Sequence, residues 1–134
     1  MTPEARFGDY IHAFNQSDWD ALRGFYAPDI RLAIGNGTEL SGREAIVEFY
    51  AKVKQQTRRT IEIIQCFAHG NVLAAEIESE LLAIEDAPEF AARPMARGDR
   101  YYLNSFVFYD FARDRYTRIR AATFRREFRP LVLD

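Results

Sequence analysis

The sequence contains few of the residues that form disulfide or metal frameworks. It has one cysteine, Cys66, and two histidines, His12 and His69, that lie far apart in the chain. A disulfide within the chain is therefore excluded, a Cys/His metal site is not expected, and nothing requires an oxidising compartment. We expect the protein to work without a metal ion or an organic cofactor.

Long apolar runs and a strong charge imbalance are also missing. No apolar run reaches the roughly 18 residues of a membrane-spanning helix, and the N-terminal segment MTPEARFGDY is too polar for a signal peptide. Eighteen basic and twenty acidic residues give a net charge of −2. This balance predicts no broad surface for nucleic acid or anionic membranes. We therefore expect a cytoplasmic protein with neither of these partners.

Aromatic residues, by contrast, are abundant. Eleven Phe, seven Tyr and one Trp make up 14% of the 134 residues. The length suits one domain spanning residues 1–134, and a chain of this size buries about two-thirds of the surface of its unfolded form. So many rings in a small domain indicate either a dense core or the walls of an apolar cavity.

The hydrophobic pattern is helical in the first half of the chain. Phe7, Tyr10, Ile11 and Phe14 recur with the spacing of one helical stripe after the capping residue Thr2. A short second helix is predicted to end at about Tyr26, a brief strand covers 30–34, and the S-x-x-E capping box of Ser41 to Glu44 starts a third helix.

The second half of the chain is rich in β-branched and aromatic residues between turn signals. This pattern predicts four long antiparallel strands, at about 59–68, 72–86, 99–110 and 115–128. Helices followed by a sheet meander indicate an α+β domain in which the helices cover one face of a curved antiparallel sheet. The connection 87–98 is long enough to form a flap.

Several motifs of the first half resemble those of a known superfamily. They are the N-x-x-D-x-D-A-L break at Asn15 to Leu22, the Y-A-P-D entry into the first strand, and the third helix L-S-G-R-E-A-I-V-E-F-Y. The sequence resembles the nuclear transport factor two-like superfamily, and within it the SnoaL-like polyketide cyclases and ketosteroid isomerases. The resemblance implies a cone-shaped curved sheet wrapped around three N-terminal helices, a cystatin-like roll. It also implies an apolar pocket and a homodimer through the outer face of the sheet.

The resemblance assigns functional positions residue by residue. Ketosteroid isomerases use a tyrosine and a protonated aspartate as an oxyanion hole and a second aspartate as the base. Tyr10 corresponds to that tyrosine, and Asn104 stands at the position of the protonated aspartate, where its amide can still donate a hydrogen bond. The base position is occupied by Ile34, and the last-strand acid of related cyclases and epoxide hydrolases is replaced by Ala121. Isomerisation by the familiar mechanism is therefore not expected.

Glu76, Glu78 and Glu80 alternate along one predicted strand and so share one face. In one interpretation this face is solvated or lies in a dimer interface, since unpaired carboxylates are costly inside an apolar cone. In the other, Glu76 and Glu78 occupy the second-strand positions of the acid and arginine in epoxide hydrolase-like relatives. They would then point into the pocket, where a raised pKa would suit a general base.

The remaining candidate pocket residues follow from strand parity and from the first helical stripe. They are Phe14, Ile34, Tyr102, Phe106, Phe108, Ile119 and Ala121. Phe49 and Tyr50 are interpreted as packing residues, and Arg59 as a solvated residue at a strand end. Arg126 is assigned to the outer parity of the last strand.

Two hypotheses of different classes follow. The first is a cofactor-independent isomerase, cyclase or dehydratase for an apolar carbonyl-bearing or polycyclic substrate, in which Tyr10 and Asn104 polarise an oxygen and Glu76 or Glu78 moves a proton. The second is a non-catalytic module that binds an apolar ligand or dimerises. The face on which Glu76 and Glu78 lie distinguishes the two.

Overall fold

The computed structural model describes residues 1–35 and 37–132. The helices are α1 (Pro3–Asn15), α2 (Trp19–Phe25) and α3 (Arg43–Gln56); the strands are β1 (Tyr26–Ala33), β2 (Glu39–Ser41), β3 (Thr57–His69), β4 (Val72–Ala83), β5 (Arg100–Ala112) and β6 (Arg115–Arg129). The chain thus has the predicted order of helices first and a meander of long strands second. The short strand β2 is an addition to the prediction.

Of the two helix caps predicted from the sequence, one forms and one does not. The Thr2 hydroxyl caps α1 by accepting a hydrogen bond from the Ala5 amide at 3.0 Å. The predicted capping box at Ser41 does not form, because Ser41 pairs with Arg31 as the last residue of β2 and Gly42 takes the cap position without a side-chain bond. The start of α3 is therefore set by strand pairing.

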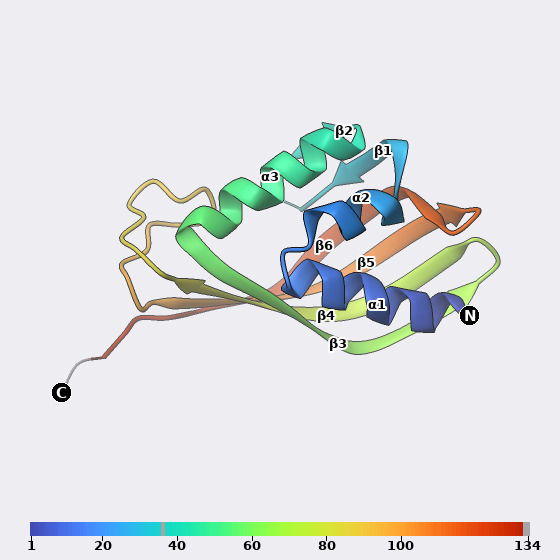
Figure 1. Cartoon of the computed structure of the whole chain (residues 1–134). Helices are drawn as coiled ribbons and strands as arrows, with labels where there is room; N and C mark the ends of the chain where they lie inside the picture. The colour runs from blue at the N-terminus through green and yellow to red at the C-terminus, as the bar shows by residue number, and fades with distance from the viewer. Residues whose placement is uncertain (36, 133–134) are drawn as a thin grey trace.

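The sheet is mixed and bent. Its strand order is β2-β1-β6-β5-β4-β3, and all neighbours are antiparallel except β1 and β6, which run parallel. Register shifts interrupt the β3/β4 pair once and the β5/β6 pair twice, and such bulges bend and twist a sheet. The long strands accordingly curve around the helices (Figure 1).

The core lies between the helices and the concave face of the sheet. Helix α1 packs on β3, and α3 packs on β1 and β3. Phe7 and Phe14 of α1, Leu22 of α2 and Leu73 of β4 are at most 1% exposed. None of the helices in the described part of the chain is long and apolar enough to cross a membrane.

Candidate ligand-binding site

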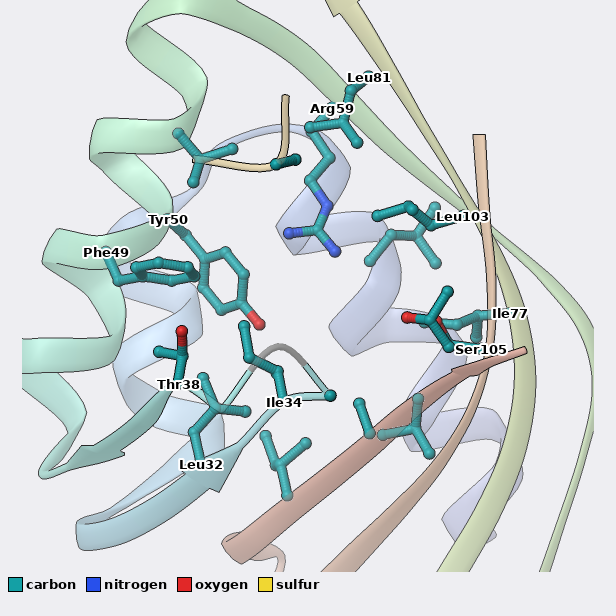
Figure 2. A pocket seen from close by; sticks show the side chains of 18 of the residues that line it. Leu32, Ile34, Thr38, Phe49, Tyr50, Arg59, Ile77, Leu81, Leu103 and Ser105 are labelled. Carbon is teal, nitrogen blue, oxygen red and sulfur yellow. The ribbon is translucent and has the colours of Figure 1, made fainter. Parts of the chain in front are cut away.

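The helices and the sheet do not close completely on each other. They leave a cavity of about 270 Å³, far more than the ~15 Å³ that one water molecule needs and close to the size of small-molecule sites. Its wall includes Leu32, Ile77 and Leu103 (Figure 2). Val107 and Tyr109 also line it. Most of the lining is apolar, so the cavity is suited to an apolar molecule.

Five of the residues predicted for the pocket line this cavity. They are Tyr10, Phe14, Ile34, Ile119 and Ala121. They come from α1, from the end of β1 and from β6, elements far apart in the chain that meet around one space. Phe49 and Tyr50 of α3, interpreted from the sequence as packing residues, also belong to the lining.

The predicted site residues of β5 lie on the other face of the sheet. Phe106 and Phe108 are 54% and 49% exposed, and Tyr102 donates a hydrogen bond to Glu80 on the outer face. The prediction that these side chains line the pocket is therefore corrected. The inner face of β5 is formed by the alternate residues Tyr101, Leu103, Ser105, Val107 and Tyr109.

Asn104 and the carboxylate row share this outer face. Asn104 pairs with Glu78 across the strands and donates a hydrogen bond to its carboxylate at 3.2 Å. Gln65 donates to Glu76 at 3.0 Å. The inner residues of β4 between these acids, such as Ile77 and Ser79, are buried. The assignment of Asn104 as an oxyanion-hole donor, and of Glu76 or Glu78 as a base in the pocket, is thus corrected, because these side chains lie on the outer face of the sheet.

Tyr10, which lines the cavity, is paired with a second tyrosine, Tyr26. The hydroxyls of Tyr10 and Tyr26 lie 2.7 Å apart and are both buried. Burial, reinforced by the neighbouring tyrosines, raises the pKa of Tyr10 well above its usual value, and burial does the same for the pKa of Tyr26. Both hydroxyls therefore stay protonated at neutral pH, and one of them donates a hydrogen bond to the other.

Arg59 was missed as a site residue by the sequence analysis. Its guanidinium points into the cavity, and the hydroxyl of Tyr50 points into the same space from α3 (Figure 2). The guanidinium carbon lies 5.4 Å from the centre of the Tyr50 ring. The alternation of side chains along β3 could have identified Arg59, because it lies on the same strand face as Ile61 and Ile63, which pack in the core.

A bulge in β6 brings a second arginine to the lining. Asn104 pairs with Arg125 but Ser105 pairs with Thr123, so the alternation of inner and outer residues shifts at this point. Arg126 therefore reaches the cavity wall, although simple parity predicts the outer face. Next to it, the hydroxyls of Ser105 and Thr123 lie 3.1 Å apart and add polar groups to the wall.

The connection predicted to form a flap contributes to the cavity wall. Phe90, Ala91 and Ala92 line the cavity. The connection is fastened by Asp99, whose carboxylate accepts hydrogen bonds from the Ala96 and Leu131 amides at 2.9 Å each. These two bonds hold the pKa of Asp99 below its usual value.

The chemical capacity of the site follows from its lining. The described residues that line the cavity include tyrosine, serine and threonine hydroxyls and two arginines, but no aspartate, glutamate or histidine. These groups can donate hydrogen bonds to an oxygen atom, whereas a carboxylate or imidazole base is absent from the described wall. Within residues 1–35 and 37–132, no cluster of three or more acidic, His or Cys side chains could hold a metal ion.

Comparison with known proteins supports the same fold. A candidate polyketide cyclase from Xanthomonas campestris is 25% identical in sequence. The match covers 89% of this chain and 87% of the cyclase chain, and the two structures superpose with a TM-score of 0.76. A candidate polyketide cyclase from Pseudomonas putida gives 24% identity, 90% coverage of both chains and a TM-score of 0.76. A limonene epoxide hydrolase-like enzyme from Mycobacterium tuberculosis gives 12% identity, 90% and 80% coverage, and a TM-score of 0.73.

No curated protein matches the chain significantly. The family model of the SnoaL-like domain matches residues 7–119, which is most of the chain. This match and the superpositions confirm both the predicted resemblance and the curved-sheet α+β fold. The chain therefore belongs to the SnoaL-like domain family.

Proposed function

We propose that the protein binds a small, predominantly apolar molecule in the cavity between the helices and the sheet. The observation that carries this proposal is the 270 Å³ apolar cavity, into which a few hydroxyl and guanidinium groups converge. Such a combination of apolar wall and few polar groups is typical of small-molecule sites. Binding needs only the groups that are present, whereas acid–base catalysis needs a base that the described wall lacks.

Ligand binding is tested by filling the cavity. Ala121 lines the cavity, whereas the adjacent Ala122 is exposed on the outer face. We expect Ala121→Phe to abolish the thermal stabilisation that apolar ketones and aromatic amides give to the wild-type protein, and Ala122→Phe to retain it. Circular dichroism establishes that both variants fold. Absence of stabilisation by any member of the panel, or equal binding to both variants, contradicts the proposal.

A ring-closing or isomerising reaction is the second candidate. The similarity to a candidate polyketide cyclase favours it, as do protonated tyrosine hydroxyls that can polarise a carbonyl oxygen. With no carboxylate base in the described wall, the proton would have to leave an acidic carbon of the substrate itself towards solvent. We expect Tyr10→Phe to lower turnover of a polyketone substrate by about 100-fold or more, the usual effect of losing one oxyanion donor. Unchanged turnover in this variant would exclude Tyr10 from the reaction.

The outer face of the sheet is proposed as a homodimer interface. Phe106 and Phe124 stack there with ring centres 4.3 Å apart, and each is about half exposed. On the same sheet, Glu76 of β4 pairs with Phe106, and Arg120 of β6 pairs with Phe108. A two-fold axis through the aromatic cluster would set the acids of one copy against the arginines of the other.

A further inference from the structure

Arg59 is a cationic residue of the wall of the proposed ligand site. It pairs with Leu81 near the start of β3, on the same side of the sheet as Ile61, and its guanidinium points towards the middle of the cavity (Figure 2). Several arginines on the surface of this protein pair with acids, for example Arg23 with Glu44 at 2.9 Å. Arg59 is different because it faces an apolar space.

No acid in the described part of the chain neutralises this charge. None of the ion pairs of residues 1–35 and 37–132 includes Arg59, and none of the lining residues described is acidic. Among the described residues, Arg59 has one hydrogen bond, a long one of 3.4 Å from Nη2 to the Ser79 hydroxyl, and its buried Nε has no acceptor there. Buried polar groups are normally satisfied, so the guanidinium retains unused donors that face the cavity.

Two aromatic rings hold the guanidinium in place. Its central carbon lies 5.5 Å from the centre of the Phe14 ring and 5.4 Å from that of the Tyr50 ring. Cation–π contacts of this kind orient the charge but use none of its N–H donors. Lys54 lies 4.2 Å from the centre of the same Phe14 ring, so a second cation adds to the positive potential beside the cavity.

We propose that the cavity selects apolar molecules that carry a carboxylate, which forms an ion pair with Arg59 and accepts a hydrogen bond from the Tyr50 hydroxyl. This inference rests on the proposed function and specifies its ligand class. A guanidinium presents two parallel N–H groups that match the two oxygens of one carboxylate. Apart from Arg59, Arg126 and the few hydroxyls, the cavity wall is apolar. An apolar body with one carboxylate therefore fits the distribution of polar groups.

The inference is tested by calorimetric titration with matched acid and amide pairs, cinnamate against cinnamamide and naphthoate against naphthamide. Each pair has the same shape and differs in the charge of one group. We expect the wild-type protein to bind each acid at least about tenfold more tightly than its amide, as charged hydrogen bonds typically provide. Arg59→Met should remove this preference and leave amide affinity within about twofold of wild type.

Two further variants separate charge from structure. Arg59→Lys keeps the charge without the planar fork, so its preference for the acid should be intermediate. Arg58→Met removes an exposed neighbour of opposite parity and should bind like wild type. If Arg59→Met does not fold, the inference is tested by comparing the preference for acid over amide in the wild-type protein and in Arg59→Lys.

The outcomes distinguish this inference from the proposed function. Equal binding of acids and amides to the wild-type protein, or an acid preference that survives in Arg59→Met, overturns the role of Arg59 but leaves small-molecule binding intact. Failure of every acid and amide to bind overturns both. An acid preference that is lost in Arg59→Met and retained in Arg58→Met supports both.

Discussion

The hydroxyls of Tyr10 and Tyr26 lie 2.7 Å apart in the core, and neither tyrosine is more than 3% exposed. This bond joins α1 to the first residue of β1, and Tyr10 also lines the cavity. Arg59 and Tyr50 supply polar groups at another part of the wall.

Removing the Tyr10 hydroxyl should destabilise the protein. In Tyr10→Phe, the buried Tyr26 hydroxyl loses its partner, which costs about 1–3 kcal/mol. Tyr102→Phe removes a hydroxyl that bonds to Glu80 on the partly solvated outer face, and the loss should be smaller, below about 1 kcal/mol. The measurement is denaturant unfolding of both variants, and equal losses would contradict the importance of the buried pair.

Lys54 should titrate at unusually low pH. Burial, and secondly the charge of Arg59, lower the pKa of Lys54 to about 8. A nuclear magnetic resonance titration of its side chain should show this midpoint, and Arg59→Met should move it upwards without restoring the usual 10.5, since burial is the larger cause. Arg58→Met is the control and should leave the midpoint unchanged.

The lowered pKa of Lys54 also predicts how the stability of the protein depends on pH. Between about pH 8 and 10.5 the folded protein has released the Lys54 proton, while the unfolded chain still holds it. Unfolding therefore binds a proton, and the free energy of unfolding rises with pH through this group. Relative to Lys54→Met, the wild-type protein should become more stable across this range. A constant difference between the two proteins would contradict the lowered pKa.

Asp99 should control the connection beside the cavity. Because hydrogen bonds from Ala96 and Leu131 lower its pKa in the folded protein, its contribution is complete above the usual value of 3.8 and is lost as the pH falls through the folded value. Acidification below this range should reduce hydrogen-exchange protection at these two amides. Asp99→Asn should do so at neutral pH, whereas Glu89→Gln, an exposed change in the same connection, should not. Unchanged protection in Asp99→Asn would show that the carboxylate does not fasten the segment.

The proposed dimer depends on the exposed rings of the outer face. Phe106→Asp should convert a dimer into a monomer, because it buries a charge beside Phe124 in the interface. Ile84→Asp, at an equally exposed residue beyond the end of β4, should leave the dimer intact. Light scattering after size-exclusion chromatography gives the molar mass, and a wild-type monomer at all concentrations would contradict the interface.

The fold was largely predictable from the sequence, but the side of the sheet on which each β5 residue lies was not. Helical stripes and the Thr2 cap carry strong local signals, whereas β5 has aromatic residues on both faces and its own parity is undecided. The decisive information is in the partner strand. Asn104 faces Glu78 across the β4/β5 pair, so an outward carboxylate row requires an outward Asn104 and outward Phe106. Treating strands singly allowed incompatible assignments for residues that share one face.

Arg59 and Arg126 were not predicted as site residues, and the physical reason is different. Arg59 carries a charge at an inward position, and burial of a charge is usually read as unfavourable unless a partner is known. Arg126 reaches the wall only because a bulge shifts the alternation in β6. Both effects depend on tertiary packing and on strand register, which the local pattern of residues does not contain.

The central claim is that the cavity is a ligand site, and methyl-resolved nuclear magnetic resonance tests it most directly. Naphthoate added to the labelled protein should give saturable shifts of cavity methyls such as those of Ile77, Leu103 and Val107. Methyls of the exposed residues Ile64 and Ile84 should remain unshifted. Shifts confined to those exposed methyls, or no saturable shift in the cavity, would contradict the account.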